Sequence, residues 1–81
     1  MNIVEVRYLH GYQVEVVFDD GQVRIADFSG FLQKAKNPMS TQFKDIEMFK
    51  NVEIDHGDLS WEDGEMDFPA DNIYKGKYSR K

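Results

Sequence analysis

The first 28 residues alternate between apolar and polar side chains, and two turn signals divide this alternation into three runs. His10-Gly11 separates the first run from the second, and Asp19-Asp20-Gly21 separates the second from the third. Asp-Gly readily supplies the positive φ angles that tight hairpin turns require. The apolar positions that share a face within each run are Val4, Val6 and Tyr8, then Tyr12, Val14, Val16 and Phe18, then Val23 and Ile25. Because a period of two is typical of half-buried strands, the pattern predicts a three-stranded antiparallel meander.

The alternation stops at Ser29-Gly30, and the apolar spacing then becomes helical. The first helix is predicted from Phe31, Leu32 and Ala35, with Asp27 or Ser29 as its N-cap and Asn37-Pro38 as its end. The second is predicted from Phe43, Ile46 and Phe49, with Ser40 or Thr41 as its N-cap. Helices of this length are unstable alone, so both are expected to dock on the sheet.

A second hairpin is predicted after the helices. Val52 and Ile54 alternate with polar residues, the segment 56–58 turns, and Leu59 and Trp61 continue on a returning strand. Asp63-Gly64 predicts another turn, and Pro69 the start of a helical turn anchored by Ile73 and Tyr74. The sequence therefore predicts one α+β domain over residues 1–74. Its parts are an N-terminal three-stranded antiparallel meander, two short helices, a second β-hairpin and a short C-terminal helical turn. Residues 75–81 are predicted to form a flexible basic tail.

Composition excludes several classes of protein. The chain of 81 residues has no cysteine, which excludes disulfides, thiolate catalysis and zinc–thiolate sites. Its net charge of −5 disfavours direct binding of nucleic acid. The N-terminus lacks the basic and apolar regions of a signal peptide, and no apolar run approaches the roughly 20 residues of a membrane span. We therefore expect a cytoplasmic protein with no membrane contact.

The acidic segment between Lys50 and Lys75 contains no Lys or Arg. Its eight carboxylates are Glu53, Asp55, Asp58, Glu62, Asp63, Glu65, Asp67 and Asp71. The EF-hand pattern fails here because Phe68 stands where glycine is required, so no metal site and no cofactor are predicted. A solvated face is the simplest interpretation. The alternative is a partner-binding patch, and its candidate residues are Trp61, Glu62, Asp63, Glu65 and Asp67. Trp61 shares a predicted face with Leu59, which favours a core position over an exposed aromatic patch.

His56 lies beside Asp55 and Asp58, and a His–Asp pair is half of a catalytic relay. Such a relay also needs a positioned nucleophile, and the nearest hydroxyl, Ser60, lies on a predicted strand. No catalytic residue is therefore assigned. A metal-dependent hydrolase that uses the acidic hairpin with His56 is kept as the alternative function.

Five segments taken together resemble a small bacterial family, domain-of-unknown-function family 2442. They are Phe18-Asp-Asp-Gly21, Ala26-Asp-Phe28 leading into Phe31-Leu32, Phe49-x-x-Val52-x-Ile54-Asp55, Leu59-x-Trp61-x-x-Gly64-x-x-Asp67 and Asp71-x-Ile73-Tyr74. One departure is Glu62-Asp63, where the family tends to have proline followed by a small polar residue. The resemblance implies an α+β fold and no established activity. It also implies a gene setting similar to that of small two-protein modules of toxin–antitoxin appearance.

We therefore expect a non-catalytic protein-interaction or regulatory module, such as one half of a toxin–antitoxin-like pair. Its partner is expected to be a small basic protein that binds the acidic hairpin, since opposite charges steer association. Homodimerisation through an exposed strand edge is compatible with this expectation.

Overall fold

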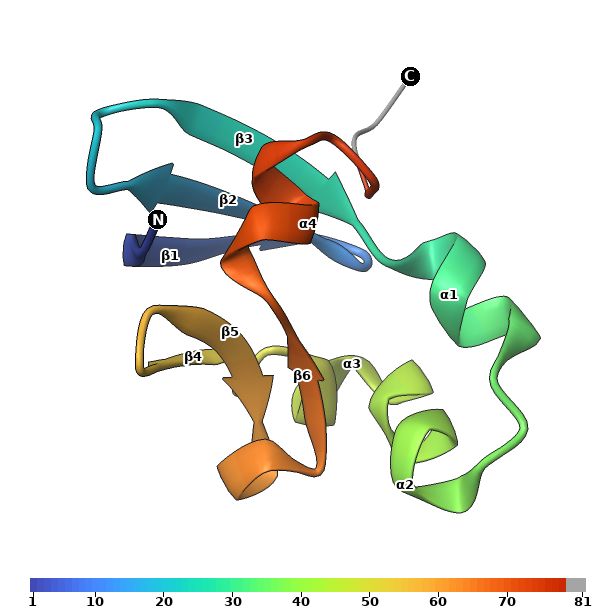
Figure 1. Ribbon diagram of the computed structural model, residues 1–81. Coiled ribbons are helices and arrows are strands. Elements are labelled where there is room, and N and C mark those ends of the chain that lie inside the picture. Colours follow the sequence, from blue (N-terminus) through green and yellow to red (C-terminus); the bar gives the residue numbers. More distant parts are fainter. Residues whose placement is uncertain (79–81) are drawn as a thin grey trace.

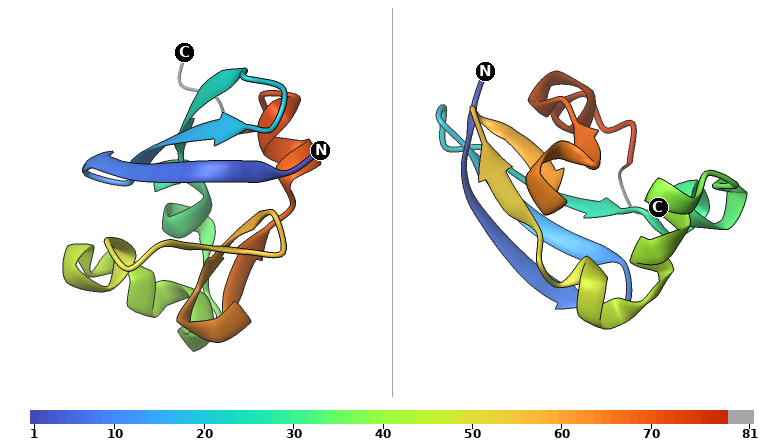
Figure 2. Two further views of the ribbon diagram at one scale, coloured as in Figure 1. Left: turned by 90° about the vertical axis from the view of Figure 1, so that its left-hand side faces the viewer. Right: turned by 90° about the horizontal axis from the view of Figure 1, so that it is seen from below.

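The computed structural model describes residues 1–78 of the chain, apart from the side chains of Met39 and Asp63. Two three-stranded antiparallel sheets lie one above the other, with short helices at one side and between them (Figures 1 and 2). The predicted α+β class is therefore confirmed. The buried side chains of both sheets and of the helices form one hydrophobic core.

The first sheet is the predicted meander, in the order β1 (Ile3–His10), β2 (Gln13–Phe18) and β3 (Val23–Asp27). Its inner face buries Val14, Val16, Phe18 and Ala26. The alternation of β2 therefore fixes which face of this sheet meets the core, as the sequence predicts.

The two strands beside β2 differ from the prediction in which side chains they bury. Val4, Val23 and Ile25 are 59%, 48% and 42% exposed. In β1, a register shift between Ile3 and Glu5 turns Val4 outward and leaves Ile3 buried. In β3, the pairing of Val14 with Ala26 places Ala26 on the inner face, so its neighbours along the strand point away from the core. Pairing register decides the buried face of a strand, and a shift of one residue reverses it.

The helical region contains four short elements where the sequence predicts two helices. These are α1 (Ser29–Lys34), α2 (Pro38–Thr41), the 3₁₀ turn η1 (Gln42–Lys44) and α3 (Ile46–Phe49). The N-cap of α1 is Phe28, so neither Asp27 nor Ser29 occupies the predicted cap position, although the Asp27 carboxylate accepts the Ser29 amide at 2.9 Å. Ser40 and Thr41 lie inside α2 and cap no later helix.

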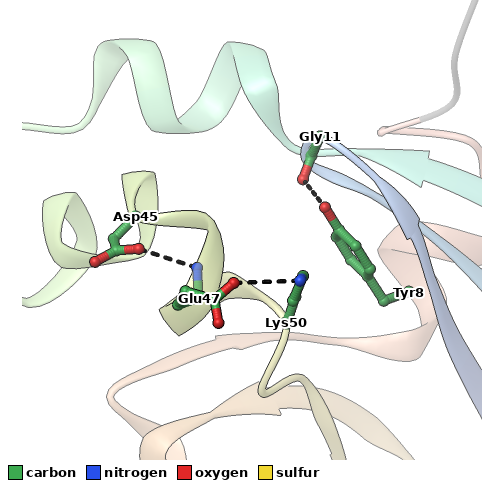
Figure 3. A network of polar contacts seen from close by, with 5 residues as sticks. All are labelled: Tyr8, Gly11, Asp45, Glu47 and Lys50. Atoms are coloured by element: carbon green, nitrogen blue, oxygen red, sulfur yellow. Dashed lines mark hydrogen bonds and ion pairs between the residues drawn. The ribbon is translucent and has the colours of Figure 1, made fainter.

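Asp45 explains the break before α3. Its backbone is extended, with ψ 118°, and its carboxylate accepts the Glu47 amide at 2.9 Å (Figure 3). Capping by Asp45 therefore starts a new helix in the middle of the predicted one. Lys50 follows α3, forms an ion pair with Glu47 at 3.2 Å and lies 5.8 Å from the ring centroid of Tyr8.

The second sheet contains the predicted hairpin and one strand that the sequence did not predict. Its strands are β4 (Glu53–Asp55), β5 (Asp58–Trp61) and β6 (Met66–Phe68). The 3₁₀ turn η2 (Glu62–Gly64) connects β5 to β6, and α4 (Ala70–Tyr74) follows Pro69 as predicted. β6 has only three residues between a turn and a proline, so its alternation is too short to identify. All of β4 is exposed, including Ile54, which shares a face with the buried Leu59 but lies on the edge strand of the sheet.

Trp61 lies at the centre of the core and is completely buried. Its indole N–H donates to the Phe49 carbonyl oxygen at 2.7 Å. Its ring contacts the rings of Phe28, Phe49 and Phe68 at centroid distances of 5.6, 5.3 and 5.8 Å. Trp61 therefore joins the end of the first sheet, α3 and β6, and the core interpretation of this residue is confirmed.

Residues 75–78, the first part of the predicted tail, contact the domain. The Tyr78 ring lies 5.0 Å from the rings of Phe28 and Phe68, and the Asp27 amide donates to the Tyr78 carbonyl at 2.8 Å. The rest of the predicted tail, 79–81, lies outside the described residues.

Gly57, in the turn between β4 and β5, lies against the start of β1. Its φ is +86°, its carbonyl accepts the Ile3 amide at 2.8 Å, and a Cβ added to it would lie 2.4–2.9 Å from side-chain atoms of Asn2. Gly21 has almost the same φ, +87°, with open space around it. Comparing substitutions at the two glycines therefore distinguishes the cost of a strained backbone from the cost of a steric clash with Asn2.

We expect Gly21→Ala to lower the free energy of unfolding by about 1 kcal/mol, the cost of a left-handed backbone for alanine. Gly57→Ala should lower it by about 1–3 kcal/mol more, because the new methyl group also displaces Asn2. Urea unfolding followed by circular dichroism measures both changes. Combining Gly57→Ala with Asn2→Gly should bring the loss back toward that of Gly21→Ala. Equal losses for the two alanine variants would contradict the close approach.

Candidate functional site

The candidate site is the acidic outer side of the second sheet and the turn beside it. Cross-strand pairing places Glu53 opposite Ser60, and Ser60 opposite Asp67, so the three residues form a row on one face. The other face of β5 carries Leu59 and Trp61, which point into the core. Glu53 and Asp67 are exposed. The carboxylates of this row therefore lie in solvent, opposite the buried aromatic face.

The η2 turn carries two further candidates. Glu62 and Glu65 are exposed, and Glu65 accepts a hydrogen bond from the Gln42 side chain at 2.7 Å, which ties this turn to η1. Glu62 adopts a positive φ of 50°, which is uncommon for a residue with a side chain. The side chain of Asp63 lies outside the described part of the structure. We call the set Glu53, Glu62, Glu65 and Asp67 the acidic surface.

No carboxylate of the acidic surface forms an ion pair with a described residue. The ion pairs within residues 1–78 join Arg7 to Glu15, Lys50 to Glu47 and His56 to Asp55. Exposed charges of one sign that lack local counter-charges produce a negative potential that extends into solvent. This surface can therefore attract a cationic group.

Two residues of the acidic segment have structural roles. Trp61, a predicted partner-binding residue, is buried and hydrogen-bonded to the Phe49 carbonyl, so its side chain lies outside the acidic surface. Asp58 accepts the Ala70 amide at 2.7 Å and so satisfies a free N–H group at the start of α4. Asp58 therefore supports the fold and lies outside the acidic surface.

His56 has a carboxylate partner but no arrangement for catalysis around it. Its Nδ1 lies 2.8 Å from Asp55 Oδ1, in a turn where the imidazole is 93% exposed. Ser60, the hydroxyl nearest in sequence, is buried. Within residues 1–78, no three His, Asp or Glu side chains gather in a way that could hold a metal ion. No pocket opens among these residues either.

Ser60 Oγ is the buried side-chain polar atom that has no hydrogen-bond partner among the described residues. A buried hydroxyl without a partner costs about 1–3 kcal/mol of stability. Ser60 is therefore a weak point in the middle of the second sheet.

We expect Ser60→Ala to raise the free energy of unfolding by about 1 kcal/mol, because the change removes the unsatisfied hydroxyl at almost constant volume. Chemical unfolding measures the change. Ser40→Ala in α2, at a half-buried position, serves as the control and should change stability by less than about 0.5 kcal/mol. A loss of stability in Ser60→Ala would mean that the hydroxyl has a partner.

A second polar cluster, which the sequence did not reveal, ties the β2–β3 turn to α4. The Tyr74 hydroxyl donates to Asp20 Oδ2 at 2.7 Å. The Arg24 guanidinium lies 4.8 Å from the Tyr74 ring centroid, and its Nε donates to the Tyr74 carbonyl at 3.2 Å. Asp20 and Tyr74 lie 54 residues apart in the chain, so no local pattern connects them.

This hydrogen bond shifts both pKa values. The Gln22 amide and then the Tyr74 hydroxyl stabilise the Asp20 carboxylate and hold its pKa below the usual 3.8. The bond to Asp20 raises the pKa of Tyr74 above the usual 10.0. Asp20 therefore contributes stability above pH 3.8, which is lost as the pH falls through its folded pKa. Tyr74 contributes below pH 10.0, and this part is lost as the pH rises through its folded pKa.

We expect the stability difference between the wild type and Tyr74→Phe to be constant across neutral pH and to shrink above pH 10.0. The difference should also become smaller below pH 3.8, as Asp20 is protonated. This decrease should account for only part of the stability that the wild type loses in acid, because the Gln22 amide still stabilises the Asp20 carboxylate in the variant. Unfolding midpoints measured across the pH range test this. A difference that does not change in alkali would contradict the Tyr74–Asp20 hydrogen bond.

The fold and the acidic surface define a small α+β domain of two three-stranded sheets with no recognisable catalytic arrangement among its described residues. The chain matches the family described as "Protein of unknown function (DUF2442)" over residues 3–79, and it belongs to this family. The resemblance seen in the sequence is thereby confirmed. No curated protein and no solved structure matches the chain. Among the described residues, every helix is too short to cross a membrane.

Proposed function

We propose that the chain is a non-catalytic interaction module that binds a small basic protein through the acidic surface. The observation that carries this proposal is the set of four exposed carboxylates that have no ion-pair partner among the described residues. Lys and Arg side chains of a partner would supply the missing counter-charges. Such complementarity accelerates encounter and orients the two proteins, and salt weakens it.

The structure beneath the acidic surface supports a docking role. β5 and β6 are fixed from the inside by Trp61 and Phe68, and the η2 turn is tied to η1 by the Gln42–Glu65 hydrogen bond. A surface held in this way loses little conformational entropy when a partner binds. The acidic surface is therefore prearranged for binding.

We extend the proposal to a regulatory role within a two-protein pair of the toxin–antitoxin kind. The support for this extension is the resemblance to the family, which implies for many members a gene setting similar to that of small two-protein modules. In such a pair the acidic module would neutralise a basic partner by covering its cationic surface. Any effect on nucleic acid would then come through the partner.

The alternative, a metal-dependent hydrolase that uses the acidic hairpin with His56, has less support. His56 contacts only Asp55 among the acids of the hairpin, and Asp58 is occupied by the Ala70 amide. A shift in melting temperature on addition of Mg²⁺, Ca²⁺, Mn²⁺ or Zn²⁺ would favour this alternative.

To test the interaction proposal, the tagged chain is used to capture proteins from its native host, and the retained partner is then purified and its affinity measured. The test variant is Glu62→Gln, Glu65→Gln and Asp67→Asn combined. Three exposed charge pairs contribute roughly 0.2–1 kcal/mol each, so we expect about a tenfold loss of affinity at low salt.

The matched control carries Glu5→Gln, Glu15→Gln and Glu47→Gln, which change the net charge equally but lie on the first sheet and on α3. The control should bind the partner almost as the wild type does. If both triple variants lose affinity equally, only the net charge matters and the acidic surface is not the site. If neither loses affinity, the proposal is wrong.

A further inference from the structure

The outer edge of β3 carries backbone groups that pair with nothing in the described part of the chain. The Phe28 amide donates to the Tyr12 carbonyl just before β2, and the Gln22 carbonyl accepts from the Phe18 amide. The backbone groups of the even-numbered residues of this segment therefore point toward β2. Backbone groups alternate in direction along an antiparallel strand, and those of Val23, Ile25 and Asp27 therefore point away from β2. The Asp27 amide confirms this direction, because it donates to the Tyr78 carbonyl outside the sheet. The amide of Val23 and both groups of Ile25 have no such partner among residues 1–78.

The side chains at this edge include two apolar residues beside the charged Arg24 and Asp27. Natural edge strands carry charged residues or proline that discourage pairing with another strand. Val23 and Ile25 are instead exposed β-branched apolar residues, and they adjoin Val17, which pairs with Val23 on the same face. The edge of β3 therefore combines free hydrogen-bonding groups with an apolar surface.

We propose that β3 pairs antiparallel with β3 of a second copy of this chain, so that the two first sheets form one six-stranded sheet. The hydrogen bond that the Asp27 amide already forms decides which residues of the two β3 strands can lie opposite each other. If Ile25 lay opposite its own copy, Val23 would lie opposite Asp27, whose amide is already bonded to Tyr78. If Val23 lies opposite Ile25 of the second copy, four backbone hydrogen bonds can form, and none of them uses the occupied Asp27 amide. The Val23 carbonyl can accept one of them beside its bond from Arg24, since a carbonyl oxygen has two lone pairs.

This register also agrees with the apolar surface and with the charge distribution. Val17, Val23 and Ile25 of each copy would form a continuous apolar stripe, with Val23 and Ile25 as direct cross-strand neighbours. The acidic surface lies on the second sheet, below the first sheet in the view of Figure 1, whereas β3 is the upper edge. Pairing through β3 therefore keeps the acidic surfaces away from the contact between two chains that each carry a net charge of −5.

One feature opposes the dimer and gives it a distinctive salt dependence. Arg24 would lie opposite Arg24 of the second copy, although each guanidinium is held over the Tyr74 ring of its own chain. The repulsion between these groups and between the net charges is screened by salt. Dimerisation should therefore strengthen as salt is added, whereas binding of a basic partner to the acidic surface should weaken.

Sedimentation equilibrium of the wild type, from micromolar to millimolar concentration at low and high salt, tests the proposal. We expect a monomer–dimer equilibrium that shifts toward dimer with salt. Ile25→Lys should weaken it about tenfold or more, because the change replaces two apolar cross-strand contacts with charges. Val4→Lys is the matched control, since it adds the same charge at an exposed position on β1 and should leave the equilibrium unchanged.

Amide hydrogen exchange then locates the contact. The Val23 and Ile25 amides should exchange more slowly as the protein concentration rises, whereas exposed amides of β4 should not change. A monomer at every concentration would overturn the proposal. So would a dimer that resists Ile25→Lys or that shows no protection at β3. Circular dichroism of both lysine variants verifies that the fold is retained.

Discussion

The hydrogen bond from the Trp61 indole to the Phe49 carbonyl is the contact on which the arrangement of the other elements depends. It fixes the largest side chain of the core between the second sheet and α3, and Phe28 and Phe68 then pack against the indole from both sheets. No strand of this fold exceeds eight residues and no helix exceeds six within the described chain. Elements of this length are unstable alone, so a shared aromatic centre is what makes them cooperative.

The core explains why function has to be sought on the surfaces. Aromatic residues fill the space between the sheets, and polar groups that reach inward, such as the Asp58 carboxylate, are used to satisfy backbone amides. The charged side chains are left at the periphery, with the acidic surface on the second sheet and the turn beside it. The two proposals use different peripheral regions: the acidic surface for a basic partner and the edge of β3 for a second copy. Under the two proposals, the two partners would therefore not compete for the same surface.

Local patterns predicted the elements of this fold better than they predicted burial. Alternation and Asp-Gly turns identify β1, β2 and β3, but the exposure of Val4 and Ile25 follows from the pairing register, which no single strand encodes. The apolar spacing predicts one continuous helix across Asp45, but the capping hydrogen bond of the Asp45 side chain starts a new helix there. At the candidate site, the sequence identified the exposed Glu62, Glu65 and Asp67. It did not reveal the hydrogen bonds of Trp61 and Asp58, whose partners Phe49 and Ala70 are distant in sequence.

The contacts of Tyr78 have a consequence for where the folded unit ends. A fragment cut after Tyr74 would keep every helix and strand, yet it would uncover the rings of Phe28 and Phe68. It would also release the Asp27 amide and so lengthen the unpaired edge of β3 at its C-terminal end. Longer apolar edges recruit further strands without a defined stopping point. The segment after α4 therefore covers these aromatic rings and occupies the C-terminal end of the β3 edge, which leaves a shorter open edge than the fragment would have.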